Sequence, residues 1–175
     1  MRFFINFFFL LFIVFLFSSK TNSNENIVYI DLEKIMSQSK AGISISTQLE
    51  KMHLKNIENF KKIENELKEE EAKILSQKNI LDNDEYKKKI NELRNKTNNY
   101  RSQRNKDIDD LTKKRLDATN KLLNEINPVL INYSNENSIS IIFQKKNIII
   151  GKSELDITDE IQLLVDAKIS KIKLD

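Results

Sequence analysis

The pattern of apolar and polar positions begins with a short β-type run. Residues 27–30 are Ile-Val-Tyr-Ile and predict a strand. Residues 32–38 fit a short helix, with Asp31 placed to cap its N-terminus. Ser39 and Gly42 indicate a break before the next element. From about residue 43 the pattern becomes helical.

A heptad repeat runs from residue 60 to residue 81. Phe60, Leu67, Ile74 and Leu81 lie seven positions apart, with Ile63 between the first two. Such spacing places apolar side chains on one stripe of a helix and is typical of a coiled-coil seam. The pattern predicts a helix of about 35 residues, roughly 50 Å long.

A turn signal at residues 81–84 separates this helix from a second one. Asp82 or Asn83 can cap the second helix, which we expect to continue to about residue 134 with a kink at Pro128. Acidic and basic residues four positions apart, such as Glu64–Lys68 and Glu92–Lys96, should support both helices. Two long helices joined by a short turn predict an antiparallel hairpin, apolar at its base and poor in apolar residues between positions 94 and 107.

The remaining elements follow a polar break at residues 135–138. Residues 139–143 and 148–150 are β-type runs, and the polar residues 145–147 between them predict a hairpin turn. A final helix should begin near residue 158, capped by Asp156 or Thr158, with an apolar face up to residue 169.

The predicted fold is mainly α with a small β core, in which a long antiparallel coiled-coil hairpin is inserted between strands of a small sheet. We expect a β-containing body domain from residues 24–42 and 135–175, and a helical hairpin domain from residues 43–134. A sheet of so few strands is marginal unless something covers it. Because the chain has no cysteine for a disulfide, we expect the sheet to be shared between subunits.

The first 23 residues have the pattern of a secretory signal peptide. Met1 and Arg2 give a positive start, residues 3–17 are apolar apart from Asn6, and residues 18–26 are small or polar. An uncleaved membrane anchor is the alternative, but spanning a bilayer takes about 20 apolar residues and this run has about 15. We expect cleavage before Asn24 and export from the cytoplasm.

Candidate catalytic chemistry is sparse. His53 is the only histidine, and with no cysteine in the chain a zinc site is not expected. Asp156, Asp159 and Glu160 form a carboxylate group that capping of the last helix explains without catalysis or metal binding. We therefore expect a protein that is not an enzyme and needs no metal or cofactor.

Charge is distributed unevenly along the hairpin. Residues 49–75 have a net charge of −1, whereas residues 76–106 have nine basic and four acidic side chains, a net charge of +5. A positive arm can attract acidic proteins, lipopolysaccharide or an anionic membrane; the alternative is a solvated helix face. The export signal argues against nucleic acid. The candidate basic tip consists of Lys87, Lys88, Lys89, Arg94, Lys96, Arg101 and Arg104.

Two stretches of the chain together resemble the Skp/OmpH family of periplasmic chaperones. The first is residues 27–42, IVYIDLEKIM followed by SQSKAG. The second comprises IIF at 141–143, KNIII at 146–150 and LDITDEI at 155–161. With the inserted hairpin, the resemblance covers residues 27 to about 170.

The resemblance implies a periplasmic homotrimer with three helical arms on a shared β core. It also implies ATP-independent holding of unfolded outer-membrane proteins, with no catalytic residues. On the arm, the candidate client-binding or seam residues are Tyr86, Ile90, Leu93 and Tyr100. A coiled-coil protein with a structural role in the cell envelope is the alternative function.

Overall fold

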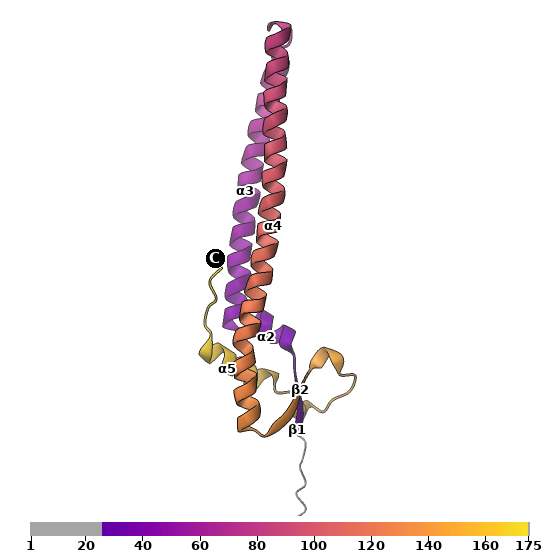
Figure 1. Ribbon diagram of the computed structural model, residues 1–175, viewed down its shortest axis with the longest axis vertical. Helices are drawn as coiled ribbons and strands as arrows, with labels where there is room; N and C mark the ends of the chain where they lie inside the picture. Colours follow the sequence, from indigo (N-terminus) through magenta and orange to yellow (C-terminus); the bar gives the residue numbers. More distant parts are fainter. Residues whose placement is uncertain (1–25, 175) are drawn as a thin grey trace, which may run out of the picture.

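The computed structural model describes residues 26–174, which form a long two-helix arm standing on a small body (Figure 1). In chain order the elements are β1 (Asn26–Ile30), α2 (Leu32–Gln38), α3 (Lys40–Ser76), α4 (Asn83–Glu136), β2 (Ile139–Gln144), the 3-10 turns η1 (Lys145–Asn147) and η2 (Ser153–Leu155), and α5 (Thr158–Lys168). We call α3 and α4 the arm and the other elements the body. The predicted signal peptide lies outside the described residues.

The arm is the predicted antiparallel hairpin. The heptad residues of α3 turn toward α4: Ile74 is buried, and Phe60, Ile63 and Leu67 are half-buried. The turn is confirmed, and Asp82 is the cap of α4, because its carboxylate accepts the N–H groups of Asp84 at 2.9 Å and Glu85 at 2.8 Å. Helix α4 runs unbroken through Pro128 for 54 residues. None of the helices within residues 26–174 is long and apolar enough to cross a membrane.

The junction of α2 and α3 differs from the expected break. Ser39 caps α3 through a hydrogen bond from the Gly42 N–H at 3.1 Å, so Gly42 lies inside the helix. A Cβ atom at Gly42 would lie 2.0 Å from the carbonyl oxygen of Met36. Gly42 is therefore a point of close contact between two helices, and Ser39 is the break.

The sheet described by the structure has two strands, β1 and β2, which are parallel. The arm returns the chain to the end where β1 began, so β2 runs beside β1 in the same direction. Val28 pairs with Ile142 and Tyr29 with Phe143. A parallel pair needs a long crossover connection, and here the whole arm provides it.

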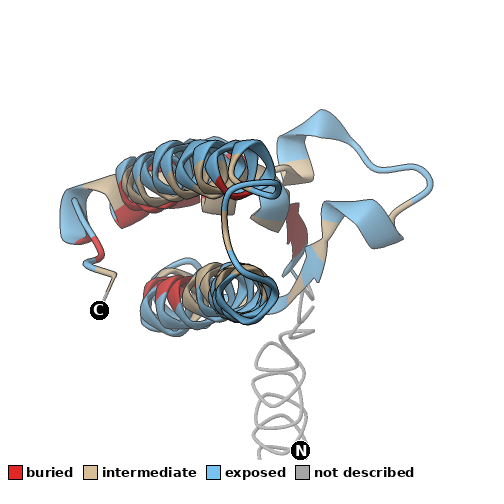
Figure 2. Ribbon diagram, turned by 90° about the horizontal axis from the view of Figure 1, so that it is seen from above, coloured by how far each residue is buried: buried red, intermediate tan, exposed pale blue. Residues whose placement is uncertain are grey.

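The prediction of a third strand at residues 148–150 is wrong. Residues 148–150 follow the turn η1 but leave the sheet, and Ile149 and Ile150 are 99% and 91% exposed. This segment is part of a loop that projects from the body, away from the arm (Figure 2). The side chains of residues 148–150 favour a β-strand, but within residues 26–174 the segment pairs with no strand.

The hydrophobic core lies where the base of the arm meets the body. The fully buried side chains include Ile35 of α2, Leu122 and Ile126 of α4, and Ile161 and Val165 of α5. Toward the tip, the described residues of the arm are mostly half-buried at best. The base of the arm is therefore anchored in the body, whereas the rest of the arm depends on its own seam.

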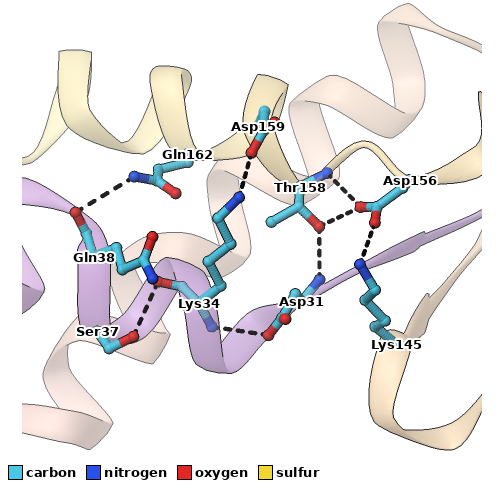
Figure 3. A network of polar contacts seen from close by, with 9 residues as sticks. All are labelled: Asp31, Lys34, Ser37, Gln38, Lys145, Asp156, Thr158, Asp159 and Gln162. Carbon is cyan, nitrogen blue, oxygen red and sulfur yellow. Dashed lines mark hydrogen bonds and ion pairs between the residues drawn. The ribbon is translucent and has the colours of Figure 1, made fainter. Parts of the chain in front are cut away.

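The start of α5 joins the two halves of the body (Figure 3). The N-cap position belongs to Ile157, which has no polar side chain, so neither Asp156 nor Thr158 is the predicted cap. The Asp156 carboxylate instead accepts the Thr158 N–H at 3.1 Å and pairs with Lys145 at 2.7 Å. The Thr158 hydroxyl accepts the N–H of Asp31 at 2.8 Å. We call these four residues the body clasp.

Candidate functional site

The middle of the arm is held by a mixed aromatic and ionic contact. The rings of Phe60 and Tyr100 meet edge to face with centroids 6.2 Å apart, and the Arg104 guanidinium lies 5.7 Å from the Phe60 centroid. Glu64 accepts a hydrogen bond from the Tyr100 hydroxyl and pairs with Arg104 at 3.5 Å. Burial and the hydrogen bond to Glu64 raise the pKa of Tyr100. The arm therefore replaces part of a purely apolar seam with specific cross-helix contacts.

The four predicted apolar site residues lie on one stripe of α4. Tyr86, Ile90, Leu93 and Tyr100 are all half-buried, and their spacing of three, four or seven positions is that of a helix stripe. Tyr100 contacts α3 directly. The structure thus brings Tyr100 into the seam, and contact of these residues with a client protein stays a prediction.

The predicted basic tip contains two kinds of cation, some exposed and some held in ion pairs. Lys87, Lys88, Arg94 and Arg101 are exposed. Lys96, however, pairs with Glu70 at 2.8 Å, and Arg104 pairs with Glu64. These bonds cross between helices, whereas the expected pairs, Glu92–Lys96 and Glu64–Lys68, lie within one helix.

Lys89 is half-buried and lies near acidic side chains. It lines a surface depression together with acidic residues of both helices, among them Glu66, Glu70 and Glu92. Part of the excess positive charge of α4 is therefore balanced by α3. The exposed cations Lys87, Lys88, Arg94 and Arg101 are distributed over about four turns of α4.

Exposed apolar side chains on the arm are the feature that sequence reasoning missed. Leu54 and Ile57 of α3 are 57% and 47% exposed, and Ile108 and Leu116 of α4 are 50% and 60% exposed. Ile80, in the turn at the tip, is 81% exposed. Leu54 and Ile57 are outside the α3 seam, which passes through Met52, Asn56 and Phe60, and this offset is the signal that could have found them.

A second apolar surface lies on the body. An open pocket of about 440 Å³ lies between the end of α4 and β2. Its lining includes Ile131, Ile141 and Phe143, which are 58%, 44% and 46% exposed. The described part of the chain thus leaves these three apolar side chains of α4 and β2 partly open to solvent.

Two of the three carboxylates singled out from the sequence have ion-pair partners, and the third, Glu160, is exposed. Asp156 pairs with Lys145 and Asp159 pairs with Lys34, each at 2.7 Å. His53 is exposed on α3. Among residues 26–174, no three His, Cys, Asp or Glu side chains are placed to hold a metal ion.

Comparisons with known proteins agree with this architecture. The family model described as outer membrane protein (OmpH-like) matches residues 26–162, most of the chain. The fold is similar to that of an OmpH-like protein of Caulobacter crescentus, with a TM-score of 0.82 and 15% sequence identity over 86% of this chain and 89% of the other. No curated protein matches the chain.

The matched region includes β1, the whole arm, β2 and the start of α5, so it covers both apolar surfaces described above. The Caulobacter protein is described as an outer membrane chaperone. The chain belongs to the OmpH-like family of outer membrane proteins.

Proposed function

We propose that this protein is an ATP-independent holdase that binds unfolded outer-membrane proteins in the periplasm. The observation that carries the proposal is the set of exposed apolar side chains on a charged arm: Leu54, Ile57, Ile108 and Leu116. Exposed apolar side chains on a charged helix are available for contact with another chain. Unfolded β-barrel segments offer apolar side chains for these contacts, and the charged residues between them keep the complex soluble.

The contacts are individually weak, which suits a holdase. Burying the exposed part of one Leu or Ile side chain contributes on the order of 1 kcal/mol, because full burial contributes about 1.5–3 kcal/mol. Several such contacts together hold a client, and each can open separately. Release therefore needs no nucleotide, only a competing and more stable state for the client, such as the folded barrel.

Self-association is part of the proposal. We expect a homotrimer whose subunits cover the apolar face formed by Ile131, Ile141 and Phe143, and which also buries Ile149 and Ile150. These exposed apolar side chains lie on the body, and a large exposed apolar patch is typical of a protein–protein interface. In this arrangement residues 24–42 and 135–175 form the assembling body domain, and residues 43–134 form the client-binding arm.

Export and lipid contact complete the proposal. OmpH family chaperones are periplasmic, and we expect this chain to reach the periplasm after removal of residues 1–23. The exposed cations Lys87, Lys88, Arg94 and Arg101 lie in the tip half of α4, where they can contact anionic lipid or lipopolysaccharide.

Dilution of a urea-unfolded outer-membrane β-barrel tests the client-binding proposal. The mature protein should suppress light scattering by the diluted barrel without added nucleotide. If scattering is unchanged at a molar excess of the protein, the holdase proposal is wrong, and a structural role in the envelope becomes the better account.

The oligomeric state has a separate test. Multi-angle light scattering of the mature protein should give the mass of a trimer. A monomer at micromolar concentration would contradict the shared sheet while leaving client binding by single arms open to the assay above.

A further inference from the structure

The C-terminal residues 169–174, which we call the strap, pack against the base of the arm without forming a helix or a strand. The strap rises from the end of α5 beside α3 (Figure 1). Its apolar side chains face the protein, and its lysines face solvent. Ile169 and Ile172 are buried at 8% and 5% exposure, and Leu174 is half-buried, whereas Lys171 and Lys173 are exposed.

One side chain of the arm holds the backbone of the strap. The Gln48 carboxamide donates through Nε2 to the carbonyl oxygen of Ile172 at 2.7 Å, and its Oε1 lies 3.4 Å from the N–H of Leu174. A carboxamide that pairs with a C=O and with the N–H two residues further on binds peptide backbone, which is the same in every sequence. Gln48 therefore recognises the extended shape of the strap and not its side chains.

The apolar side chains of the strap pack against the base of the arm, along a surface that we call the groove. Ile169 and Ile172 belong to the same buried cluster as Ile45 and Leu49 of α3 and Ala118 of α4. Between the end of the strap and α4 lies a small pocket of about 100 Å³, whose lining includes Asp117 and Ala118 of α4 and Lys173 and Leu174 of the strap. The groove thus has one side chain, Gln48, that binds peptide backbone, and an apolar floor.

We propose that this groove is a peptide-binding site and that the strap is its built-in ligand. The external ligand is an extended segment of an unfolded β-barrel protein, which presents apolar side chains separated by polar ones, as the strap does. Client segments displace the strap, and the strap lowers the apparent affinity for clients by the fraction of time it occupies the groove. This inference rests on the proposed holdase function and adds a regulated subsite to it.

A free peptide with the sequence of residues 169–175 tests the groove without any client. Because the natural chain contains no cysteine, the full-length variant Ile172→Cys has a single thiol, located in the buried part of the strap. Excess peptide should raise the modification rate of this thiol several-fold. A peptide with Asp in place of Ile172 should leave the rate unchanged, as should either peptide acting on a Lys173→Cys variant, whose thiol is exposed from the start.

A truncated chain that ends at Lys168, the last residue of α5, leaves the whole groove empty and gives a direct binding measurement. The fluorescently labelled peptide should bind this chain, and Gln48→Ala should weaken the binding roughly three- to tenfold, the loss expected for one or two hydrogen bonds. The proposal is overturned if the peptide neither binds the truncated chain nor changes the labelling of Cys at position 172.

The same thiol separates failure of this inference from failure of the holdase proposal. An unfolded β-barrel that binds the full-length protein should raise the modification rate at position 172. A barrel that binds without changing this rate contradicts the groove as a client subsite and leaves the holdase function intact. A peptide that displaces the strap while no barrel binds supports the groove and contradicts the holdase function.

Discussion

The hydroxyl of Thr158 accepts a hydrogen bond from the backbone N–H of Asp31 at 2.8 Å, although the two residues are 127 positions apart. Asp31 follows β1 and caps α2, while Thr158 begins α5. The bond therefore ties the beginning of the body to its end, across the point where the arm is inserted. It explains how the two separated stretches of the body, each too short to fold alone, close into one unit.

Removal of the Thr158 hydroxyl should destabilise the contact between the two stretches of the body. Thr158 is 3% exposed, so Thr158→Val keeps the shape of the side chain but leaves the Asp31 N–H without its partner. We expect a loss of about 1–3 kcal/mol in the free energy of unfolding. Thr158→Ser retains the hydroxyl and should lose less. Urea unfolding measures both variants, and equal losses would show that packing and not the hydrogen bond matters.

Because of the body clasp, the free energy of unfolding should depend on pH in the acidic range. Burial acts to raise the pKa of Asp156, but hydrogen bonds from Lys145 and Thr158 outweigh it and hold the pKa below its usual value. A carboxyl group with a lowered folded-state pKa contributes stability above its unfolded pKa of about 4 and loses this contribution as the pH falls through the folded value.

The free energy of unfolding, measured between pH 6 and pH 3, should therefore fall less steeply for Asp156→Asn than for the natural chain. Asp84→Asn, which alters an exposed carboxylate near the tip of the arm, provides the control and should leave the slope almost unchanged. Parallel slopes for Asp156→Asn and the natural chain would contradict this account of the clasp.

Gly42 should tolerate no side chain. Gly42→Ala would place a Cβ atom 2.0 Å from the Met36 carbonyl oxygen, so α2 and α3 would have to move apart. Overpacking of this kind costs about 3 kcal/mol. Ser46→Ala, at an exposed position one turn further along α3, should be neutral or slightly stabilising. Thermal unfolding that shifts equally for both variants would argue against the close contact.

Ser138 offers a stabilising substitution. It has a φ of 53°, in the left-handed region, where it ends α4 and turns the chain into β2. Glycine enters this region without steric cost, so Ser138→Gly should add about 0.5–1 kcal/mol to the free energy of unfolding.

The same change at Ser140, an exposed position within β2, should have the opposite sign. Glycine weakens a strand interior by about 0.5–1 kcal/mol, so Ser140→Gly should destabilise the protein. Destabilisation by both variants would show that the turn at Ser138 carries no strain.

The sequence predicts the arm well because the arm is built from local signals. The heptad positions such as Phe60 and Ile74, and the Asp82 cap, depend on residues within one or two helical turns. The same reasoning failed at residues 148–150, where β-forming side chains predict a strand but a strand also needs a partner. It also misassigned Asp156 and Thr158, because their main partners, Lys145 and Asp31, come from other elements.

The candidate site was predicted only in part. The half-buried stripe from Tyr86 to Tyr100 could be found by its spacing, but spacing does not distinguish a seam from a client surface. The charge of the basic tip could be counted, but its pairing with Glu64 and Glu70 depends on how α3 and α4 are aligned. The exposure of Leu54 and Ile57 can be predicted only when the positions of α3 that form the seam are known.

The central claim is that the exposed apolar residues of the arm bind clients. A variant with Leu54, Ile57, Ile108 and Leu116 all changed to Ser removes these residues and leaves the body unchanged. The matched control changes four exposed arm residues, Asn59, Asn95, Asn98 and Asn105, to Ser. Circular dichroism should confirm that both variants keep their helices.

The decisive measurement is the dissociation constant of each variant for an unfolded outer-membrane β-barrel, determined by fluorescence anisotropy. Loss of four partly exposed apolar side chains should weaken binding by at least about tenfold, because each contributes on the order of 1 kcal/mol when buried. The Asn-to-Ser control should bind as the natural protein does. Equal affinity of the apolar-to-Ser variant and the natural protein would contradict the claim that the arm holds its clients through these residues.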